Sequence, residues 1–290
     1  MFTLRQYLLA LLDSRGLTRT LGEIDVCRDE QGRPCFSAGN SAAVFRIRLG
    51  GRIRSLRCYL RPMRHLKEIY GQRLLEKELY LHTSPETGVW VDTVLGDWIE
   101  GSTLHETVAQ AAALRDRESL QILVRLFDRL ALALVTDDRA HGDLKPENII
   151  VGDDGTLCPI DFDASYLPAF AGEISPELGT AAYQHPARTA ANFDERIDDY
   201  PAALISTALH ALAENPTLWD RYGSSDGLLY TPQRIASDPA YRETLALFEK
   251  RGMAVQYRIA QLLTAPTLRL FGLAELLAEA VREKPAARSG

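Results

Sequence analysis

The sequence predicts an α+β fold in two lobes. A small antiparallel-sheet lobe with one main helix is expected over residues 1–98, and a mostly helical, shortened lobe over residues 99–290. The apolar pattern supports this division, because short β-like runs before Gly101 give way to helical periodicity after it. At 290 residues, the chain is also long enough for each lobe to bury an apolar face of its own.

The first lobe is expected to begin with a helix that packs on the rest of the lobe. The segment MFTLRQYLLALLDSRG places five residues on one helical face: Leu4, Tyr7, Leu8, Leu11 and Leu12. The β-like runs that follow, between about residues 23 and 60, are EIDVC, CFSAGNSAAVFRIRL and RIRSLRCYL, and turn residues such as Gly50 and Gly51 separate them. This alternation predicts a hairpin-rich antiparallel sheet. A helix from about Met63 to His82 and a strand-like pair around Val89 to Ile99 complete the predicted lobe.

Helical periodicity dominates the second lobe. Helices are expected over Leu104–Leu114, Glu118–Asp137, Asp199–Ala213, Pro239–Lys250, Ala254–Leu263 and Leu273–Glu283. The last residues, KPAARSG, are typical of a disordered end.

A polar motif interrupts these helices at residues 141–163, HGDLKPENIIVGDDGTLCPIDFD. Its loop leads into the apolar run 149–151, so Asp143, Lys145 and Asn148 are expected to cluster at the mouth of a strand. The turn residues 153–155 permit a hairpin that returns through residues 157–160 and delivers Asp161 beside Asn148. His141 is expected to be a buried structural hydrogen-bonding residue.

These residue types suit phosphoryl transfer, in which catalysis is mostly positioning and charge stabilisation. Asn148 and Asp161 offer the oxygen ligands that Mg²⁺ prefers. Asp143 can orient an attacking hydroxyl, and Lys145 can stabilise charge on the transferred group. An Asp or Asn near a turn can also be a simple cap, which is the structural alternative for each residue taken alone.

The motif resembles the catalytic segments of the protein kinases. HGDLKPEN is similar to their catalytic loop with Gly142 in place of the usual arginine, and IDFD, 18 residues further on, is similar to their DFG segment. The resemblance implies a bilobal protein-kinase-like fold and ATP and Mg²⁺ as cofactors. It implies that Asp143 is the catalytic aspartate and that Lys145 is the lysine characteristic of serine/threonine kinases. Asn148 and Asp161 would be the magnesium ligands.

Three flanking segments extend this resemblance, which is strongest to small bacterial kinase-like proteins. GTAAYQHPAR, residues 179–188, resembles the end of an activation segment, and IDDYPAALI resembles the start of a central helix at which Asp198 braces the catalytic loop. VLGDWIEGSTL resembles the segment that joins the two lobes. There the carbonyl of Asp97 and the amide of Ile99 would face adenine, although a strand that leads into a helix is the simpler alternative.

The nucleotide-binding half departs from the family pattern. SAGNSAAV stands at the Gly-rich loop, with Gly39 as the retained glycine and Val44 as the following valine. Arg57 stands where the family has a strand lysine, and either contacts phosphates or is an exposed strand arginine. Its helical glutamate partner is expected to be Glu76, with Glu68 or Glu78 as alternatives.

Other departures concern regulation and the metal site. Without an arginine at position 142, switching by phosphorylation of the activation segment is not expected. Asp163 replaces the DFG glycine, and Ala187 replaces the APE glutamate. The missing arginine implies a constitutive geometry, Asp163 could stiffen its turn or add a carboxylate near the metals, and Ala187 is one sign that the distal part of the second lobe differs from that of larger kinases.

Charge and composition exclude several classes of function. A net charge of −6 argues against general binding of nucleic acid or anionic membranes. No window approaches ~18 consecutive apolar residues, so a membrane span is not expected. The expected location is the cytoplasm. The four cysteines have no zinc-site spacing, and Cys27 and Cys35 are expected to be reduced, packed thiols that could lie across a hairpin.

The leading hypothesis is a serine/threonine kinase that acts on a protein substrate and binds nucleotide. A pseudokinase that binds nucleotide or a partner without turnover is the first alternative, because the departures affect the ATP half. A small-molecule phosphotransferase is the second, because HGDL and IDFD also resemble segments of aminoglycoside and choline kinases.

Overall fold

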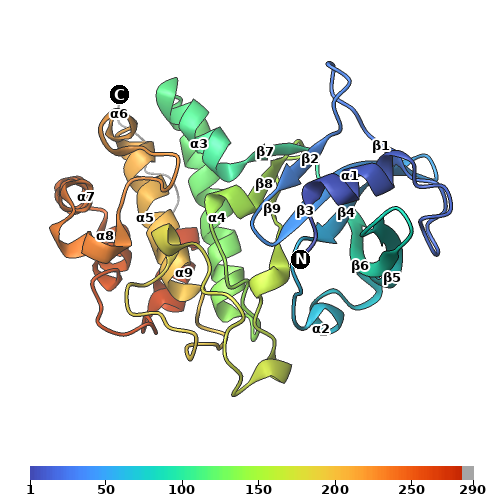
Figure 1. The fold of residues 1–290 in the computed structure, drawn as a ribbon. Helices are drawn as coiled ribbons and strands as arrows, with labels where there is room; N and C mark the ends of the chain where they lie inside the picture. Colours follow the sequence, from blue (N-terminus) through green and yellow to red (C-terminus); the bar gives the residue numbers. More distant parts are fainter. Residues whose placement is uncertain (283–290) are drawn as a thin grey trace. The chain divides into compact units, whose positions relative to one another are not determined.

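The computed structural model describes residues 1–282. The chain divides into two compact units, Met1–Ile99 (unit 1) and the residues from Glu100 onward (unit 2) (Figure 1). The α+β class expected from the sequence is confirmed, with an antiparallel sheet in unit 1 and mostly helices in unit 2, and the fold is protein-kinase-like. The last residue of the predicted helix Leu273–Glu283 and the predicted disordered end at 284–290 lie outside the described residues.

Unit 1 is a curled antiparallel sheet with one helix across a face (Figure 1). The strand order is β1-β3-β4-β6-β5, and β2 also pairs with β3. The elements are α1 (Leu4–Leu12), β1 (Asp25–Val26), β2 (Phe36–Ala38), β3 (Ala42–Leu49), β4 (Arg52–Tyr59), α2 (Leu66–Tyr70), a 3-10 turn at Gly71–Arg73, β5 (Leu74–His82) and β6 (Gly88–Asp97).

The N-terminal helix α1 packs on the sheet, as predicted. A capping box between Thr3 and Gln6 starts the helix. Tyr7 and Leu11 are fully buried in one apolar cluster with residues of β1, β3, β4 and β5, whereas Leu12 is 45% exposed, so its predicted place on the buried face is wrong. The apolar face of α1 therefore forms one side of the core of unit 1.

The predicted helix Met63–His82 is wrong. Only α2 and one 3-10 turn form, and Leu74–His82 is strand β5, which pairs with β6. Gly71, with φ 53°, ends the helix in a conformation that favours glycine. Leu, Glu and Lys in this segment favour a helix, but pairing with β6 and burial of Leu79 and Leu81 favour the strand.

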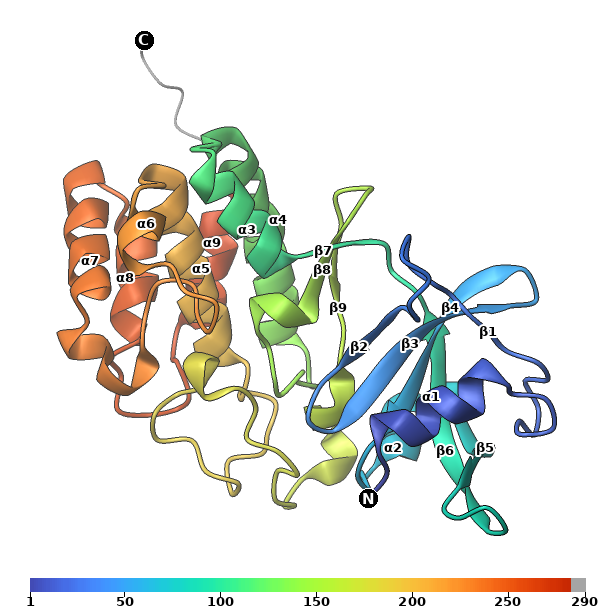
Figure 2. The ribbon, with the colours of Figure 1, turned by 45° about the horizontal axis from the view of Figure 1, so that its top comes forward.

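Unit 2 contains the remaining elements, and its helices pack side by side (Figure 2). Helices α4, α5 and α9 line one continuous apolar core. The elements are β7 (Gly101–Thr103), α3 (Leu104–Ala113), α4 (Arg117–Thr136), β8 (Ile149–Gly152), β9 (Leu157–Pro159), α5 (Asp199–Glu214), α6 (Leu218–Tyr222), α7 (Pro239–Arg251), α8 (Ala254–Leu262) and α9 (Leu273–Arg282), with 3-10 turns at Pro146–Asn148, Phe162–Ala164, Pro168–Phe170, Ala181–Tyr183 and Pro232–Ser237.

The helices predicted for unit 2 agree with these bounds to within a residue or two, and α6 was not predicted. The small sheet β7-β8-β9 contains the predicted hairpin of residues 149–160. In its register Ile149 pairs with Pro159, so the ends of β8 and β9 that carry Asn148 and Asp161 are adjacent. This sheet positions the candidate site.

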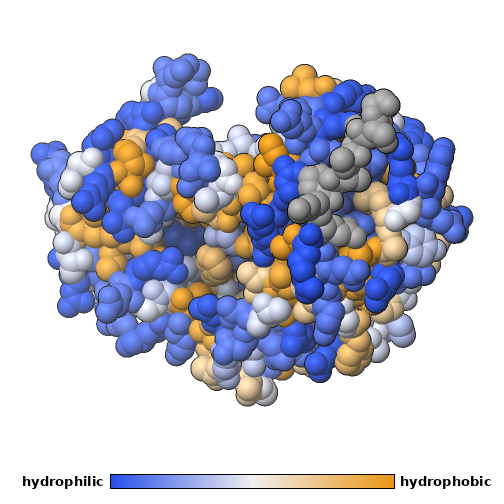
Figure 3. Space-filling model, turned by 180° about the vertical axis from the view of Figure 1, so that it is seen from behind, coloured by the Kyte–Doolittle hydropathy of each residue, from blue (hydrophilic) through white to orange (hydrophobic). Residues whose placement is uncertain are grey.

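The face of the molecule in Figure 3 mixes hydrophilic and apolar residues. Among residues 1–282, no helix has the length and apolar character needed to span a bilayer. The four cysteines are free, and the backbone amide of Cys35 donates to the carbonyl of Cys27 at 2.8 Å, so these two residues lie across a hairpin.

Candidate active site

Asp143 is the centre of a hydrogen-bonded cluster in unit 2. Its Oδ1 accepts the backbone amide of Thr180 at 2.6 Å. Its Oδ2 lies 3.2 Å from Asn148 Nδ2 and 3.4 Å from Lys145 Nζ. A carboxylate held by an amide, a side-chain amide and an ammonium has a fixed orientation, which is what positioning a substrate hydroxyl requires.

Lys145 connects the loop to the segment that contains Thr180. Its Nζ donates to Thr180 Oγ1 at 2.8 Å and forms the ion pair with Asp143. The sequence analysis identified the segment 179–188 but gave Thr180 no role. The Gly-Thr pair that opens the segment was the available signal, because Gly179 has φ 73° and a Cβ there would lie 2.7 Å from the Gly142 carbonyl oxygen.

Asn148 and Asp161 come together through the β8–β9 pairing. The amide of Ile160 donates to the carbonyl of Asn148 at 2.9 Å, which places Asp161 one residue beyond this bond. Asn148 is buried, and its Nδ2 also donates to the carbonyl of Asp143 at 3.0 Å. Asp161 has φ 67°, a left-handed conformation that is uncommon for a non-glycine residue.

The donor chemistry of these two residues fits magnesium. Because Asn148 uses Nδ2 to contact Asp143, its Oδ1 is the amide atom that can ligate a cation, and Asp161 adds a carboxylate. In residues 1–282, no group of three or more His, Cys, Asp or Glu could hold a metal ion. A magnesium ion at this pair would take its other ligands from phosphate oxygens and water, as is usual for Mg²⁺.

Buried polar residues support the loop from behind. Asp198, at the start of α5, accepts the amides of His141 at 2.5 Å and of Gly142 at 3.0 Å, so the predicted bracing of the loop is confirmed. His141 Nε2 bonds to the carbonyl of Ile160 at 2.7 Å, and His141 is 2% exposed. The structural role predicted for His141 is therefore confirmed as well.

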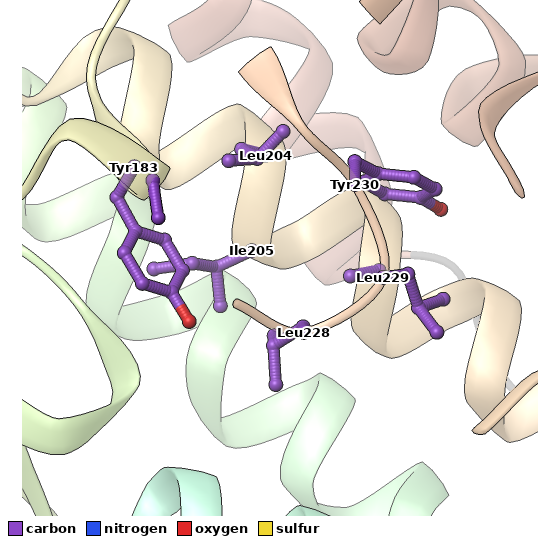
Figure 4. Close-up of a pocket in the computed structure, with 8 residues that line it drawn as sticks. Tyr183, Leu204, Ile205, Leu228, Leu229 and Tyr230 are labelled. Atoms are coloured by element: carbon purple, nitrogen blue, oxygen red, sulfur yellow. The ribbon is translucent and has the colours of Figure 1, made fainter. Parts of the chain in front are cut away.

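Tyr183 anchors the segment after Thr180 in an apolar pocket. The pocket is lined by Ala182, Tyr183, Leu204, Ile205, Ala208, Leu228, Leu229 and Tyr230. Figure 4 shows Tyr183 beside Ile205 of α5, with Leu229 and Tyr230 farther along the pocket. Burial raises the pKa of the Tyr183 hydroxyl above its ordinary value, which keeps the side chain neutral. The pocket therefore holds the segment through packing.

Two of the candidate nucleotide-binding residues, Val44 and Arg57, lie on neighbouring strands of unit 1, and Gly39 lies in the turn that precedes β3. Gly39 closes the turn between β2 and β3, with its amide bonded to the Ala42 carbonyl at 2.9 Å. Val44 and Arg57 are direct cross-strand partners on β3 and β4, so their side chains share one face of the sheet. Arg57 is half-buried, and its guanidinium lies 5.9 Å from the centroid of the Tyr59 ring. It is therefore held on the sheet rather than fully exposed.

Asp97 is the last residue of β6, and Ile99 lies two residues beyond it. The Asp97 carbonyl, which was predicted to face adenine, accepts the hydroxyl of Ser55 at 3.1 Å. Ser55 pairs with Gly96 across β4 and β6, and the sequence analysis did not single it out. A carbonyl oxygen has two lone pairs, so this bond leaves Asp97 able to accept a second donor.

Glu76 was predicted to be a helical residue, and that prediction is wrong. It lies on β5, its side chain is 62% exposed, and it forms an ion pair with Lys67 at 3.4 Å. Of the two alternatives, Glu68 is exposed on the short helix α2. Glu78 is buried, and its carboxylate accepts the amides of residues 19–21 and the Thr20 hydroxyl. Glu78 therefore organises a loop of unit 1.

The structure thus brings Asp143, Lys145, Asn148 and Asp161 together in unit 2, and Val44 and Arg57 together in unit 1. It does not give Glu76 the helical setting that its predicted role requires. The roles of all these residues in catalysis, nucleotide binding and metal binding stay predictions.

Comparison with known proteins supports a relationship to protein kinases. The chain is 28% identical over 172 residues to CBL-interacting protein kinase 17 of Oryza sativa subsp. japonica, which covers 56% of this chain and 35% of that protein. It is 34% identical over 113 residues to serine/threonine-protein kinase PknL of Mycobacterium tuberculosis, a match that covers 37% of this chain and 27% of that protein. It is 25% identical over 160 residues to serine/threonine-protein kinase chk1 of Schizosaccharomyces pombe, a match that covers 53% of this chain and 31% of that protein.

No family model matches the chain. The matched regions span about a third of the length of these curated relatives. The chain is related to the serine/threonine protein kinases and has a protein-kinase-like fold. These relatives are named as protein kinases, two of them as serine/threonine-protein kinases.

Proposed function

We propose that this chain is an ATP- and magnesium-dependent kinase that transfers a phosphoryl group to a Ser or Thr hydroxyl of a protein substrate. The observation that carries the proposal is the set of contacts that joins Asp143 to Lys145, Asn148 and Thr180. These contacts hold one carboxylate and one ammonium side by side, an arrangement that suits positioning and charge stabilisation in phosphoryl transfer.

In this proposal Asp143 orients the substrate hydroxyl and accepts its proton as the hydroxyl oxygen attacks the γ-phosphorus, and the bond from this phosphorus to the β–γ bridging oxygen breaks to release ADP. Lys145 Nζ, 2.8 Å from Thr180 Oγ1, places positive charge where the transferred phosphoryl develops negative charge. Asn148 and Asp161 hold magnesium, which neutralises charge on the phosphate oxygens when it is bound.

The nucleotide-binding roles are assigned to unit 1. Val44 offers an apolar contact for the base, and the turn at Gly39 covers phosphates. Arg57 contacts the α- and β-phosphates as a bidentate donor. The Asp97 carbonyl and the Ile99 amide bind the adenine edge.

The proposed partners are a protein substrate and a nucleotide. The net charge of −6 favours neither nucleic acid nor an anionic membrane as a partner. The proposed location is the cytoplasm.

Labelled ATP, magnesium and a panel of Ser/Thr peptides, protein extracts and small-molecule alcohols test the proposal. Asp143→Asn keeps an oxygen that can accept the Thr180 amide but removes the charge that takes the proton. We expect transfer to fall by about 10²- to 10⁴-fold. The matched control is Asp153→Asn, an exposed turn residue of the same motif, which is expected to retain wild-type transfer.

Several outcomes would contradict the proposal. Equal transfer by wild type and Asp143→Asn would exclude the assigned mechanism. Transfer to small molecules with none to Ser or Thr would contradict the substrate class. Thermal stabilisation by Mg-ATP with no turnover on any acceptor would identify a nucleotide-binding scaffold.

A further inference from the structure

Arg188, the last residue of GTAAYQHPAR, is a buried cation that contacts the catalytic loop of unit 2. It is 8% exposed. Its Nη1 donates to the carbonyl of Gly142 at 3.2 Å and also to Gln184 Oε1. Burial lowers the pKa of Arg188, while Asp198, Asp143 and Asp194 act in the opposite direction. An arginine remains charged in such a site, so the guanidinium places a positive charge beneath the loop.

The peptide group that Arg188 contacts lies next to the catalytic candidate. Gly142 directly precedes Asp143, and its amide donates to Asp198 Oδ1 at 3.0 Å. Gly142 is therefore fixed through its N–H by Asp198 and through its carbonyl by Arg188. Since the Asp143 carboxylate is bonded to the Thr180 amide, both ends of the segment 180–188 contact the loop.

A side chain at position 142 cannot supply this positive charge. Gly142 has φ 81°, and a Cβ there would lie 2.1 Å from the carbonyl oxygen of Ala164. Both the backbone conformation and the close approach of residue 164 require glycine. The arginine that the kinase resemblance leads one to expect at this position has no space, so a cation has to reach the loop from another segment.

We infer that Arg188 is a positioning residue that holds the Gly142–Asp143 peptide in its working orientation and ties the loop to residues 180–188. The cation comes from the segment itself, so no phosphate on that segment is needed to recruit it. This inference rests on the proposed function, because the orientation matters for transfer to a hydroxyl.

The surroundings of Arg188 explain why the arrangement is sensitive to substitution. Within residues 1–282, Arg188 Nε and Nη2 are buried and have no hydrogen-bond partner. The guanidinium is therefore stabilised by its two Nη1 contacts and by the charges of Asp198, Asp143 and Asp194. Truncation would leave the Gly142 carbonyl without the Arg188 donor and would remove a positive charge that interacts with the buried Asp198.

The first test is steady-state phosphotransfer by Arg188→Met and Arg188→Lys, with the exposed Arg242→Met as the matched control. We expect kcat of Arg188→Met to fall by about 10²-fold, as for a small misplacement of a catalytic group, with KM for ATP within twofold of wild type. Arg188→Lys should retain more activity than Arg188→Met.

A third variant, Arg188→Ala, allows chemical rescue. Added methylguanidinium, but not ammonium at equal ionic strength, should raise the kcat of Arg188→Ala at least fivefold. Arg242→Met should behave as wild type, and phosphatase treatment of the wild type should leave its kcat within twofold.

The second test does not depend on turnover. Hydrogen exchange of the Asp143 and Thr180 amides should become at least tenfold faster in Arg188→Met, while amides in the middle of α5 keep wild-type rates. If the wild type transfers no phosphoryl, the proposed function fails, and this exchange pattern still decides whether Arg188 orders the loop. Should Arg188→Met not fold, Arg188→Lys replaces it in both tests. A folded Arg188 variant with wild-type kcat and wild-type exchange at residues 143 and 180 would overturn the inference.

Discussion

Unit 1 and unit 2 differ in how their candidate functional residues are held. In unit 2, Asp143 contacts Lys145, Asn148 and Thr180 directly, and Asp198 fixes the loop from behind. In unit 1, Arg57 lies on β4, while Glu76 lies on β5 and pairs with Lys67. The catalytic candidates thus form one connected network, whereas the nucleotide candidates are spread over strands.

The difference shows where the chain tolerates departures from the kinase pattern. In unit 2 the departure at position 142 is matched by another residue, since Arg188 reaches the carbonyl of Gly142. In unit 1 the helix that would present a glutamate is replaced by a short helix and a strand. Arg57 is therefore the residue of unit 1 whose substitution best tests nucleotide binding.

Substitution of Arg57 tests unit 1 directly and has the largest expected effect on nucleotide binding. Arg57→Met should weaken Mg-ATP binding by about 10- to 100-fold, because a charge-assisted hydrogen bond contributes about 1.5–3 kcal/mol. Arg57→Lys should recover part of this loss, since the charge remains but the planar fork does not. Calorimetric titration with Mg-ATP measures the affinities.

Arg52→Met is the control for this experiment, because Arg52 is an exposed residue of the same strand. It should bind Mg-ATP as the wild type does. Equal affinities for Arg57→Met and Arg52→Met would remove Arg57 from the nucleotide site and leave it a structural strand residue.

Two neighbouring carboxylates of unit 2 show that burial of an acidic side chain also lowers the stability of the folded state. Asp198 accepts two loop amides, whereas Asp199 is 3% exposed and, among the residues that the structure describes, accepts only the Leu270 amide, at 3.4 Å. Burial raises the pKa of Asp199 from 3.8 to about 7. Between these two values the folded state keeps a proton that the unfolded state has released, so this group makes stability fall as the pH rises from about 4 to about 7.

Asp199→Asn should therefore stabilise the protein at pH 8 by about 4 kcal/mol and have little effect near pH 4, since the pKa shift is about three units and each unit corresponds to about 1.4 kcal/mol. The asparagine oxygen can still accept the Leu270 amide. Urea unfolding at pH 4.5 and pH 8 measures the difference, with the exposed Asp226→Asn as the control. A gain of equal size at both pH values would show that ionisation of Asp199 is not its source.

Local sequence was sufficient to predict the core of the candidate site. Asp143, Lys145 and Asn148 lie within six positions of one loop, and turn residues mark the hairpin that returns to Asp161. Contacts between distant residues were harder to foresee. Lys145 and Thr180 are 35 positions apart, and Arg188 and Gly142 are 46 apart, so only the folded path of the segment shows that they meet.

The error at residues 63–82 has a different origin. The side chains of β5 favour a helix in isolation, and the strand forms because β6 supplies backbone partners and the core accepts Leu79 and Leu81. Gly71 was the one local sign of a break, since its φ of 53° suits glycine. Intrinsic preference was thus overridden by tertiary pairing in the same unit in which the kinase pattern is weakest.

Substitution of Glu76 has the smallest expected effect, and it tests the assignment of Glu76 to strand β5 instead of a helix. Because Glu76 is exposed and its ion pair with Lys67 is a surface pair, Glu76→Gln should change stability by less than about 0.5 kcal/mol and phosphotransfer by less than twofold. Thermal unfolding and initial rates at saturating and limiting ATP measure both quantities. Glu78→Gln is the contrasting variant, since Glu78 is 1% exposed and accepts three amides and a hydroxyl. It should lose about 1–3 kcal/mol of stability.

The pair of glutamates separates a structural role from a nucleotide-binding role. If Glu76→Gln lowered the rate at limiting ATP tenfold while its unfolding stayed at the wild-type temperature, Glu76 would belong to the nucleotide site despite its place on β5. If Glu78→Gln alone lost stability, the buried carboxylate of unit 1 would serve the loop at residues 19–21. Arg57 on β4 would then remain the charged nucleotide-binding candidate of unit 1.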